Sequence, residues 1–325
     1  MTAAQGLARR ARWRWPEIVF WLVAFGALLM PSGKYLILNE IAILALFALS
    51  LDLILGYAGI VSLGHAAFFG LGAYVAGLMA KHLSGDPLLG LAAAGLAAGL
   101  LGLVTSVLVL RGADLTRLMV TLGVALVLGE VANQAAWLTG GADGLQGIVM
   151  GPLLGLFEFD IFGTVAYAYS LGVLFVAFWL ARRLVHSPFG LSLRAIRDNP
   201  LRARAVGIPV HRRLMAIYTV AALYAGLAGG LLAQTTQFVS LDVLAFHRSA
   251  DVLLVLVIGG VGYLYGGLVG AVIFKVLQDV LSGLTPQYWQ FWIGLILVAL
   301  VLLGRERLSE RVRGLWRSGA AEGAR

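Results

Sequence analysis

Long apolar stretches alternate with short polar ones along this chain. Nine stretches have about the length of a membrane-spanning helix, which needs roughly 20 residues; they cover 17–31, 36–56, 59–79, 88–110, 115–138, 158–181, 213–235, 248–282 and 289–304. Their hydrophobic residues are continuous and do not alternate, which indicates helices and excludes a β-barrel pattern. We therefore expect an all-α, polytopic membrane helical bundle with about nine or ten membrane elements, some broken by glycine or re-entrant.

Composition supports a membrane location for the whole chain. Hydrophobic residues make up 60% of the 325 residues and charged residues only 12%, whereas about a quarter of the residues of a soluble domain are charged. We expect a single transmembrane domain over residues 1–325, with the loop 182–213 as part of it. The first apolar stretch is predicted to be a retained helix, because no small-x-small cleavage site follows it.

The distribution of the +8 net charge predicts the orientation in the membrane. Eighteen of the 24 Lys and Arg lie in three places: Arg9–Arg14, 182–213 and the tail after Gly304. Basic segments face the cytoplasm in multi-pass proteins, so the N-terminus, the 182–213 loop and the C-terminus are predicted to be cytoplasmic. The segment 139–157 has no Lys or Arg and is predicted outside. This clustering is not a nucleic-acid-binding face.

The segment 248–282 decides the number of crossings. Six apolar stretches precede the basic loop, which places the N-terminus and that loop on the same side. At about 1.5 Å per residue, 248–282 is too long for one straight span, and it contains Gly259, Gly260 and Gly262. A break there, with the chain doubling back, returns the tail to the cytoplasm.

Two glycine-rich segments lie in corresponding halves of the chain. Residues 56–77 and 259–270 each hold six glycines. Paired, glycine-interrupted hydrophobic segments are typical of a transporter's central pathway, so both are predicted to meet near the bilayer middle. Close helix packing through small residues explains the same glycines, and the two interpretations are compatible.

The basic loop 182–213 holds eight Arg and one Asp, with its own helix signals. Ser187 and Pro188 are typical of a helix start, and this helix has to end before Pro200. Asp198-Asn199 then caps a second, short helix over 200–206, which Gly207 ends. A short, capped, basic helix indicates a docking surface for a soluble motor. The alternative is a loop whose charges only set orientation.

Candidate chemistry is sparse. The chain has no Cys, no phosphate-binding G-x-x-x-x-G-K-[ST] motif and no metal-ligand or catalytic spacing. We therefore expect no cofactor, no metal and no enzyme activity. Five ionisable residues fall in or beside apolar stretches, where such groups face a cavity or a partner: Asp52, His65, Glu130, Asp251 and Lys275. A hydrogen-bonded structural role is favoured for Asp52 and Lys275 and stays open for the other three. An ion-coupled secondary transporter would use such residues and is the alternative function.

Several sequence blocks together resemble a known family. They are GYAGIVSLGHAAFFGLGAY (56–74), TLGVALVLGEVANQAAWLTGGADGLQGI (121–148), SPFGLSLRAIRDNPLRARAVGIPVHRRLMA (187–216), AALYAGLAGGLLA (221–233) and SADVLLVLVIGGVGYLYGGLVGA (249–271). The chain resembles the permease subunits of bacterial branched-chain amino acid ABC importers, most of all the larger of the two permeases of the high-affinity leucine/isoleucine/valine system. Related permeases carry urea and short amides, which is a further alternative.

The resemblance implies a location in the bacterial inner membrane, as well as partners and site residues. The partners are a second permease, two ATPase subunits, an extracytoplasmic binding protein and the lipid bilayer, and the chain itself is half of the translocation path. The residues expected to couple to the ATPase are Arg194, Arg197, Asp198, Asn199, Pro200 and Gly207. Those expected at the path or gate are Ser62, Gly64, His65, Glu130, Asp251, Gly259, Gly260 and Gly262.

Overall fold

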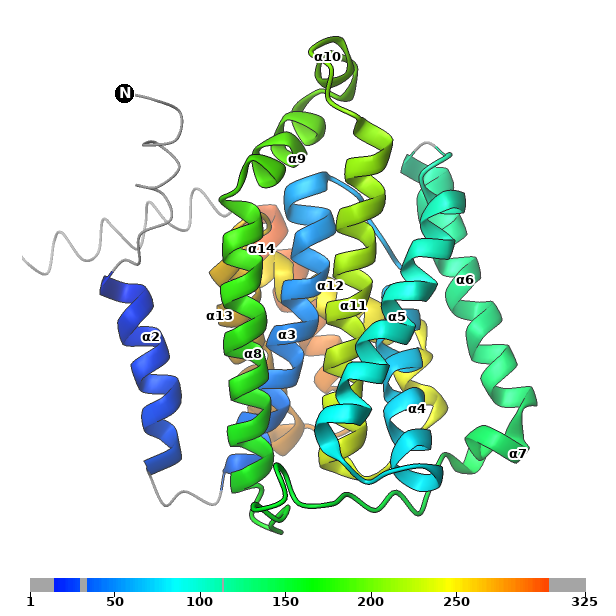
Figure 1. Cartoon of the computed structure of the whole chain (residues 1–325). Coiled ribbons are helices and arrows are strands. Elements are labelled where there is room, and N and C mark those ends of the chain that lie inside the picture. The colour runs from blue at the N-terminus through cyan, green and yellow to red at the C-terminus, as the bar shows by residue number, and fades with distance from the viewer. Residues whose placement is uncertain (1–14, 30–33, 113, 304–325) are drawn as a thin grey trace, which may run out of the picture. The chain divides into compact units, whose positions relative to one another are not determined.

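The apolar stretches form helices in the computed structural model, which describes residues 15–29, 34–112 and 114–303. The predictions for Arg9–Arg14 and for the tail after Leu303 lie outside these residues. Figure 1 shows the elements, which are α2 (Trp15–Gly26), η1 (Ala27–Leu29), α3 (Tyr35–Ala58), α4 (Ala66–His82), α5 (Pro87–Val109), α6 (Asp114–Gln134), α7 (Ala136–Thr139), η2 (Gly141–Asp143), α8 (Thr164–Val185), α9 (Pro188–Asp198), α10 (Pro200–Ala205), α11 (Val210–Thr236), η3 (Leu241–Leu244), α12 (Phe246–Gly259), α13 (Leu264–Leu284) and α14 (Trp289–Leu303).

The fold class is confirmed. Six of the described helices are long and apolar enough to cross a membrane, and the extended pairing found in the described residues consists of the isolated bridges Leu145↔Val239 and Leu153↔Phe157. The chain divides into two compact units, 1–272 and 273–325. In the described part of the second unit, α13 reaches Leu284 and α14 is a 15-residue apolar helix.

The interior of the first unit is built around α3 and α11. α11 packs against α3, α4 and α5, and α3 packs against α8. Small residues allow these contacts, because a Cβ on Gly72 would collide with the backbone of Gly226, and one on Gly229 with the carbonyl of Phe69. Polar side chains add hydrogen bonds between helices: Asn39 Nδ2 donates to Thr235 Oγ1 (3.1 Å).

Helix directions follow from these side contacts. Asn39 accepts from Ser170 Oγ at 2.6 Å near the starts of α3 and α8, so these helices run parallel. α2 runs the other way, because Glu17 pairs with Arg182. The start of α2 therefore lies beside the last turns of α8, the helix that leads into α9. The 139–157 segment lies at the opposite end, where Leu145 N donates to Val239 O (2.7 Å) just beyond α11.

Two crossings are only partly helical. The predicted span 59–79 begins with the non-helical residues 59–65, and α4 starts only at Ala66. Before α12, residues 237–245 are also non-helical, except for the short η3. Backbone groups freed in this way find side chains: Ala66 N donates to Ser249 Oγ (2.9 Å), and Leu63 N to Thr121 Oγ1 (3.3 Å). Irregular backbone is tolerated at membrane depth when protein buries it in this manner.

The predicted break in 248–282 is confirmed. α12 ends at Gly259 and α13 begins at Leu264, with φ of 107° at Gly260 and 81° at Gly262. The two helices form an antiparallel hairpin, because Gly259 lies against Gly266 and Val255 against Gly270. α12 has 14 residues and, at about 1.5 Å per residue, is too short to cross alone.

The helix after the 139–157 segment is displaced from its predicted span of 158–181. α8 starts at Thr164, because Asp160 accepts hydrogen bonds from Thr164 N (3.2 Å) and Val165 N (3.0 Å). Partial burial acts to raise the pKa of Asp160, but these hydrogen bonds outweigh it and lower the pKa below its ordinary value. α8 then continues to Val185, so Arg182 and Arg183 are helical and not part of the loop.

Candidate functional site

The loop between α8 and α11 contains the two helices that its sequence indicates. Ser187 Oγ accepts from Gly190 N (3.4 Å) at the start of α9, and Asn199 Oδ1 accepts from Arg202 N (2.9 Å) at the start of α10. Gly207 has φ of 88°. Asp198 is the last residue of α9 and does not cap α10, so of the predicted Asp198-Asn199 pair only Asn199 is the cap.

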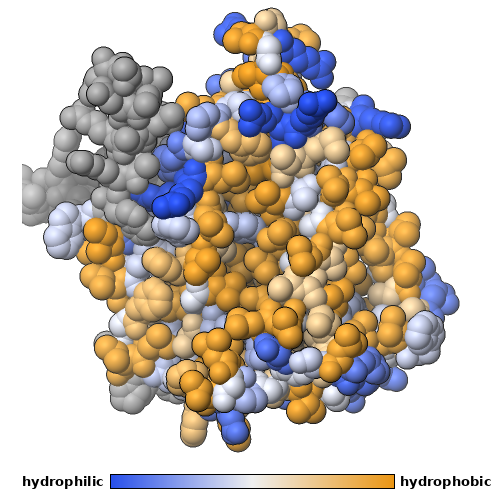
Figure 2. Space-filling model, viewed as in Figure 1, coloured by the Kyte–Doolittle hydropathy of each residue, from blue (hydrophilic) through white to orange (hydrophobic). Residues whose placement is uncertain are grey.

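α9 anchors the loop to the membrane helices. Its apolar side, Gly190, Leu193 and Ile196, is buried, and a Cβ on Gly190 would collide with the Val185 carbonyl at the end of α8. α10 is far more open, since Leu201 is 74% and Val206 76% exposed. Hydrophilic side chains gather at this end of the unit, above a largely hydrophobic flank (Figure 2). The apolar side chains on α10 are therefore a surface feature that needs an explanation.

Arg194 and Arg197 face the membrane helices. The Arg197 Nη1 group donates to the carbonyl of Gly56, and the Arg194 guanidinium lies 5.3 Å from the centre of the Tyr57 ring. Both partners belong to the last turn of α3. These arginines therefore attach α9 to α3, whereas Asn199, Pro200 and Gly207 lie exposed around α10.

The two glycine-rich segments meet at the same place. Asp52 Oδ1 accepts from Gly262 N (2.7 Å), and Gly262 lies against Gly56 so closely that a Cβ on Gly56 would overlap it. Asp52 has the structural hydrogen bond that was favoured for it. The meeting point is the C-terminal end of α3, beside α9.

Ser62, Gly64 and His65 lie in the buried non-helical crossing 59–65. His65 is fully buried, its Nε2 lies 2.8 Å from Ser50 Oγ, and its ring stacks on Phe47. Ser62 is 1% exposed, and a Cβ on Gly64 would overlap the carbonyl oxygen of Thr121 on α6. The contacts of His65 and Gly64 join the crossing to α3 and α6, so these two residues have a structural role, whereas the buried Ser62 hydroxyl makes no hydrogen bond among the described residues.

The remaining ionisable candidates are dispersed. Glu130 is exposed on α6 and accepts from Gln134 Nε2 at 2.7 Å, one turn away on the same helix. Asp251 is half-buried in the first half of α12. Lys275 donates to Gln278 Oε1 (3.1 Å), in keeping with the structural role favoured for it. Of the candidate path glycines, Gly259, Gly260 and Gly262 form the α12–α13 turn.

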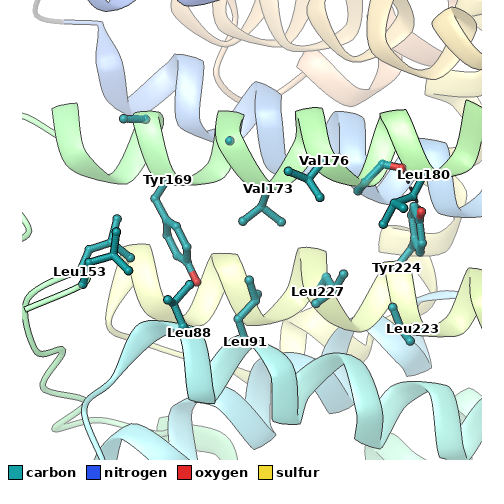
Figure 3. A pocket seen from close by; sticks show the side chains of 14 residues that line it. Leu88, Leu91, Leu153, Tyr169, Val173, Val176, Leu180, Leu223, Tyr224 and Leu227 are labelled. Carbon is teal, nitrogen blue, oxygen red and sulfur yellow. Dashed lines mark hydrogen bonds between the residues drawn. The ribbon is translucent and has the colours of Figure 1, made fainter.

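A lateral pocket of about 480 Å³ lies between α5, α8 and α11 (Figure 3). Leucine and valine side chains such as Leu91, Val173 and Leu227 line it. The hydroxyls of its two tyrosines are already used, since Tyr169 OH donates toward Gln234 Oε1 (3.0 Å) and Tyr224 OH to the Ala177 carbonyl (2.9 Å). The pocket therefore suits hydrocarbon and offers little to an amino acid's charged groups.

Sequence reasoning missed several of these residues. Leu201 and Val206 were not among the predicted site residues, although two large apolar side chains on a short, charged helix are a signal in themselves. The Glu17–Arg182 pair, 2.7 Å, joins residues too far apart in sequence for any spacing rule to connect them.

Comparisons with known proteins agree with this architecture. The family model described as "Branched-chain amino acid transport system / permease component" matches residues 35–301. The high-affinity branched-chain amino acid transport system permease protein LivM of Escherichia coli is 28% identical over 86% of this chain and 71% of its own length. The L-arabinose ABC transporter permease protein AraH of Azospirillum brasilense is 31% identical over 85% and 78%, and the fructose import permease protein FrcC of Rhizobium meliloti 29% over 88% and 82%. No solved structure matches the chain.

The family match spans both broken crossings, the α9–α10 loop and the α12–α13 hairpin. It does not reach α2 and its Glu17–Arg182 pair. Together with the permease relatives, the six long apolar helices identify a multi-pass protein of the inner membrane. This chain belongs to the family of branched-chain amino acid transport system permease components, the membrane permeases of ABC importers.

Proposed function

We propose that the chain forms half of a translocation path for branched-chain amino acids, in a complex with a second permease, two ATPase subunits and an extracytoplasmic binding protein. The family description and the LivM relative support this substrate. Sugars are the competing substrate class, because relatives of similar identity are named as arabinose and fructose permeases. Family membership favours ATP-driven import over the ion-coupled alternative.

The observation that carries the proposal is the construction of α9 and α10. α10 is held by Asn199 at one end and Gly207 at the other, and it presents the exposed side chains of Leu201 and Val206. We assign it as the helix that docks into the ATPase, with Arg202 and Arg204 beside the apolar contact. Buried apolar anchors with a charged rim are typical of such interfaces.

α9 connects the docked helix α10 to the membrane helices. Arg197 of α9 donates a hydrogen bond to Gly56 at the end of α3. Asp52, one turn earlier on α3, accepts one from Gly262 at the α12–α13 hairpin. A displacement of α10 by the ATPase would therefore reach both glycine-rich segments through direct contacts. In this role Arg194, Arg197 and Asp52 transmit movement, while Asn199, Pro200 and Gly207 shape the docking helix.

Glu130 and Asp251 remain candidates for the path. The side of α6 around Glu130 is exposed and includes Leu126, Val127 and Val131. An acidic group on an otherwise apolar helix surface is costly unless it faces a cavity or a partner. We propose that this face meets the second permease, with Glu130 bordering the path between them.

A matched pair of substitutions tests the docking assignment. In vesicles containing the chain and its proposed partners, Val206→Glu is expected to abolish substrate-stimulated ATP hydrolysis, because it places a carboxylate in the apolar contact. Val149→Glu changes an equally exposed valine, 72% against 76%, at the opposite end of the bundle and is expected to leave stimulation unchanged. Full stimulation in Val206→Glu would refute the assignment of α10.

The same vesicles test the substrate. Leucine, isoleucine or valine is expected to stimulate hydrolysis in the presence of the binding protein, and L-arabinose or fructose is not. Stimulation by a sugar alone would assign the chain to sugar import, whatever the result for α10.

A further inference from the structure

A basic cavity of about 720 Å³ lies between α2, the end of α8, α9 and the turn before α13. Its charged lining consists of Arg182, Arg194, Arg197 and Glu17, with His186 beside them. Three arginines against one glutamate leave a formal charge of +2 (3 − 1) with the histidine neutral. The cavity therefore favours an anion.

The arginines are held in place by neighbouring groups. Arg182 pairs with Glu17 at 2.7 Å, Arg194 lies over the Tyr57 ring, and Arg197 donates through Nη1 to the Gly56 carbonyl. A guanidinium carries five N–H donors in a planar fork that matches phosphate oxygens. A bound phosphate would thus meet donors that are already oriented.

An apolar groove of about 280 Å³ lies along the same helices as this cavity. On α2, Glu17 lines the cavity and Trp21, one turn further, lines the groove; on α13, Tyr265 lines the cavity and Leu268 the groove. Residues three or four apart share one face of a helix. The rings of Phe20 in the groove and Tyr265 in the cavity lie 5.8 Å apart, so the two spaces are neighbours.

We propose that this combined site binds an anionic phospholipid, with the headgroup phosphate among the arginines and an acyl chain in the groove between α2, α3 and α8. The charge of the cavity disfavours headgroups that also bring an amine, and basic pockets between membrane helices suit acidic headgroups. The chain's own ends do not complement the site, since Arg9–Arg14 holds four Arg and residues 304–325 hold six Arg against three Glu.

The headgroup part is tested with a matched pair of histidines. The full-length chain is purified in mild detergent, and native mass spectrometry compares retained phosphatidylglycerol with phosphatidylcholine. His186→Glu is expected to reduce the preference for phosphatidylglycerol about fivefold, the effect of about one charge at a membrane surface. His211→Glu, at an exposed position of α11 outside the cavity, is expected to keep the preference. Tyr263→Glu, at a 70% exposed residue of the cavity lining, repeats the test should His186→Glu fail to fold.

The acyl-chain part is tested on α2. Val23 lines the groove and Val19, one turn earlier, lines neither space. Val23→Trp is expected to fill the groove and release phosphatidylglycerol, whereas Val19→Trp retains it. Equal retention in His186→Glu and His211→Glu would refute the site. Displacement of the lipid by inorganic phosphate, with no effect of Val23→Trp, would show a free-phosphate site and overturn the lipid assignment.

Discussion

At the scale of single residues, the broken crossing 59–65 depends on how closely two backbones approach. Gly64 packs so closely against the Thr121 carbonyl that a Cβ would overlap it, and its neighbour His65 is hydrogen-bonded to Ser50. The sequence raised two explanations for the glycines, path-lining and packing. The contacts of Gly64 are those of a packing residue, while Gly260 holds φ of 107°, a conformation that residues with a Cβ rarely adopt. Leucine at either position would disturb assembly as well as transport.

A pair of alanine substitutions measures this packing. Gly64→Ala is expected to destabilise the chain by about 1–3 kcal/mol, since the new methyl group overlaps backbone that cannot move aside. Gly129→Ala, on α6 with open space around it, is expected to be neutral or slightly stabilising. Thermal unfolding of the purified chain, followed by loss of monodisperse elution, reports both. An unchanged melting temperature for Gly64→Ala would contradict the close contact.

At the scale of elements, the ends of α10 are predicted by residues close to them in sequence. Asn199, Pro200 and Gly207 define its ends in the sequence as they do in the structure, because caps and chain-reversing glycines act within a few residues. These local residues do not predict the direction in which each side chain points. Arg194 and Arg197 were expected to couple to the ATPase, and the structure adds that both contact the last turn of α3. The packing of α9 on the membrane helices, which lie far away in sequence, decides this direction.

The Asn199 cap is expected to control the stability of α10 alone. Asn199→Ala removes the side-chain acceptor for Arg202 N and is expected to cost about 1 kcal/mol, which raises local amide exchange about fivefold. Hydrogen–deuterium exchange of peptides covering 200–206 measures this, with peptides from α3 as the internal reference. Asn199→Ser keeps an acceptor and should restore slow exchange. Equal exchange in the alanine and serine variants would mean that the cap is not what holds this helix.

At the scale of the whole molecule, the two ends of the bundle are predicted to face different compartments. The chain has no cysteine, so single cysteines at Asp143 and Arg204, both exposed, give an unambiguous label. In oriented inner-membrane vesicles, an impermeant maleimide is expected to modify Arg204→Cys from the cytoplasmic side and Asp143→Cys from the opposite side. Labelling of both positions from the same side would refute the scheme.

The sequence by itself determined the fold class of this protein and the ends of its loop helices, and it predicted the orientation in the membrane. Hydrophobic length identifies spans and basic residues predict sides, because each group responds to the bilayer separately. Local caps define α9 and α10, and the length of 248–282 required a break at its glycines. These inferences need no knowledge of which helices are neighbours.

Only the tertiary structure decided where these elements meet. The span 59–79 is mostly apolar, yet its first third, residues 59–65, is non-helical, because Thr121 and Ser249 from distant helices satisfy its backbone. The paired glycine segments touch at the end of α3, because Asp52 accepts from Gly262, 210 residues away. Apolar residues look alike to a bilayer, so hydrophobicity brings the helices into the membrane, while close backbone contacts and a few long-range hydrogen bonds select their neighbours.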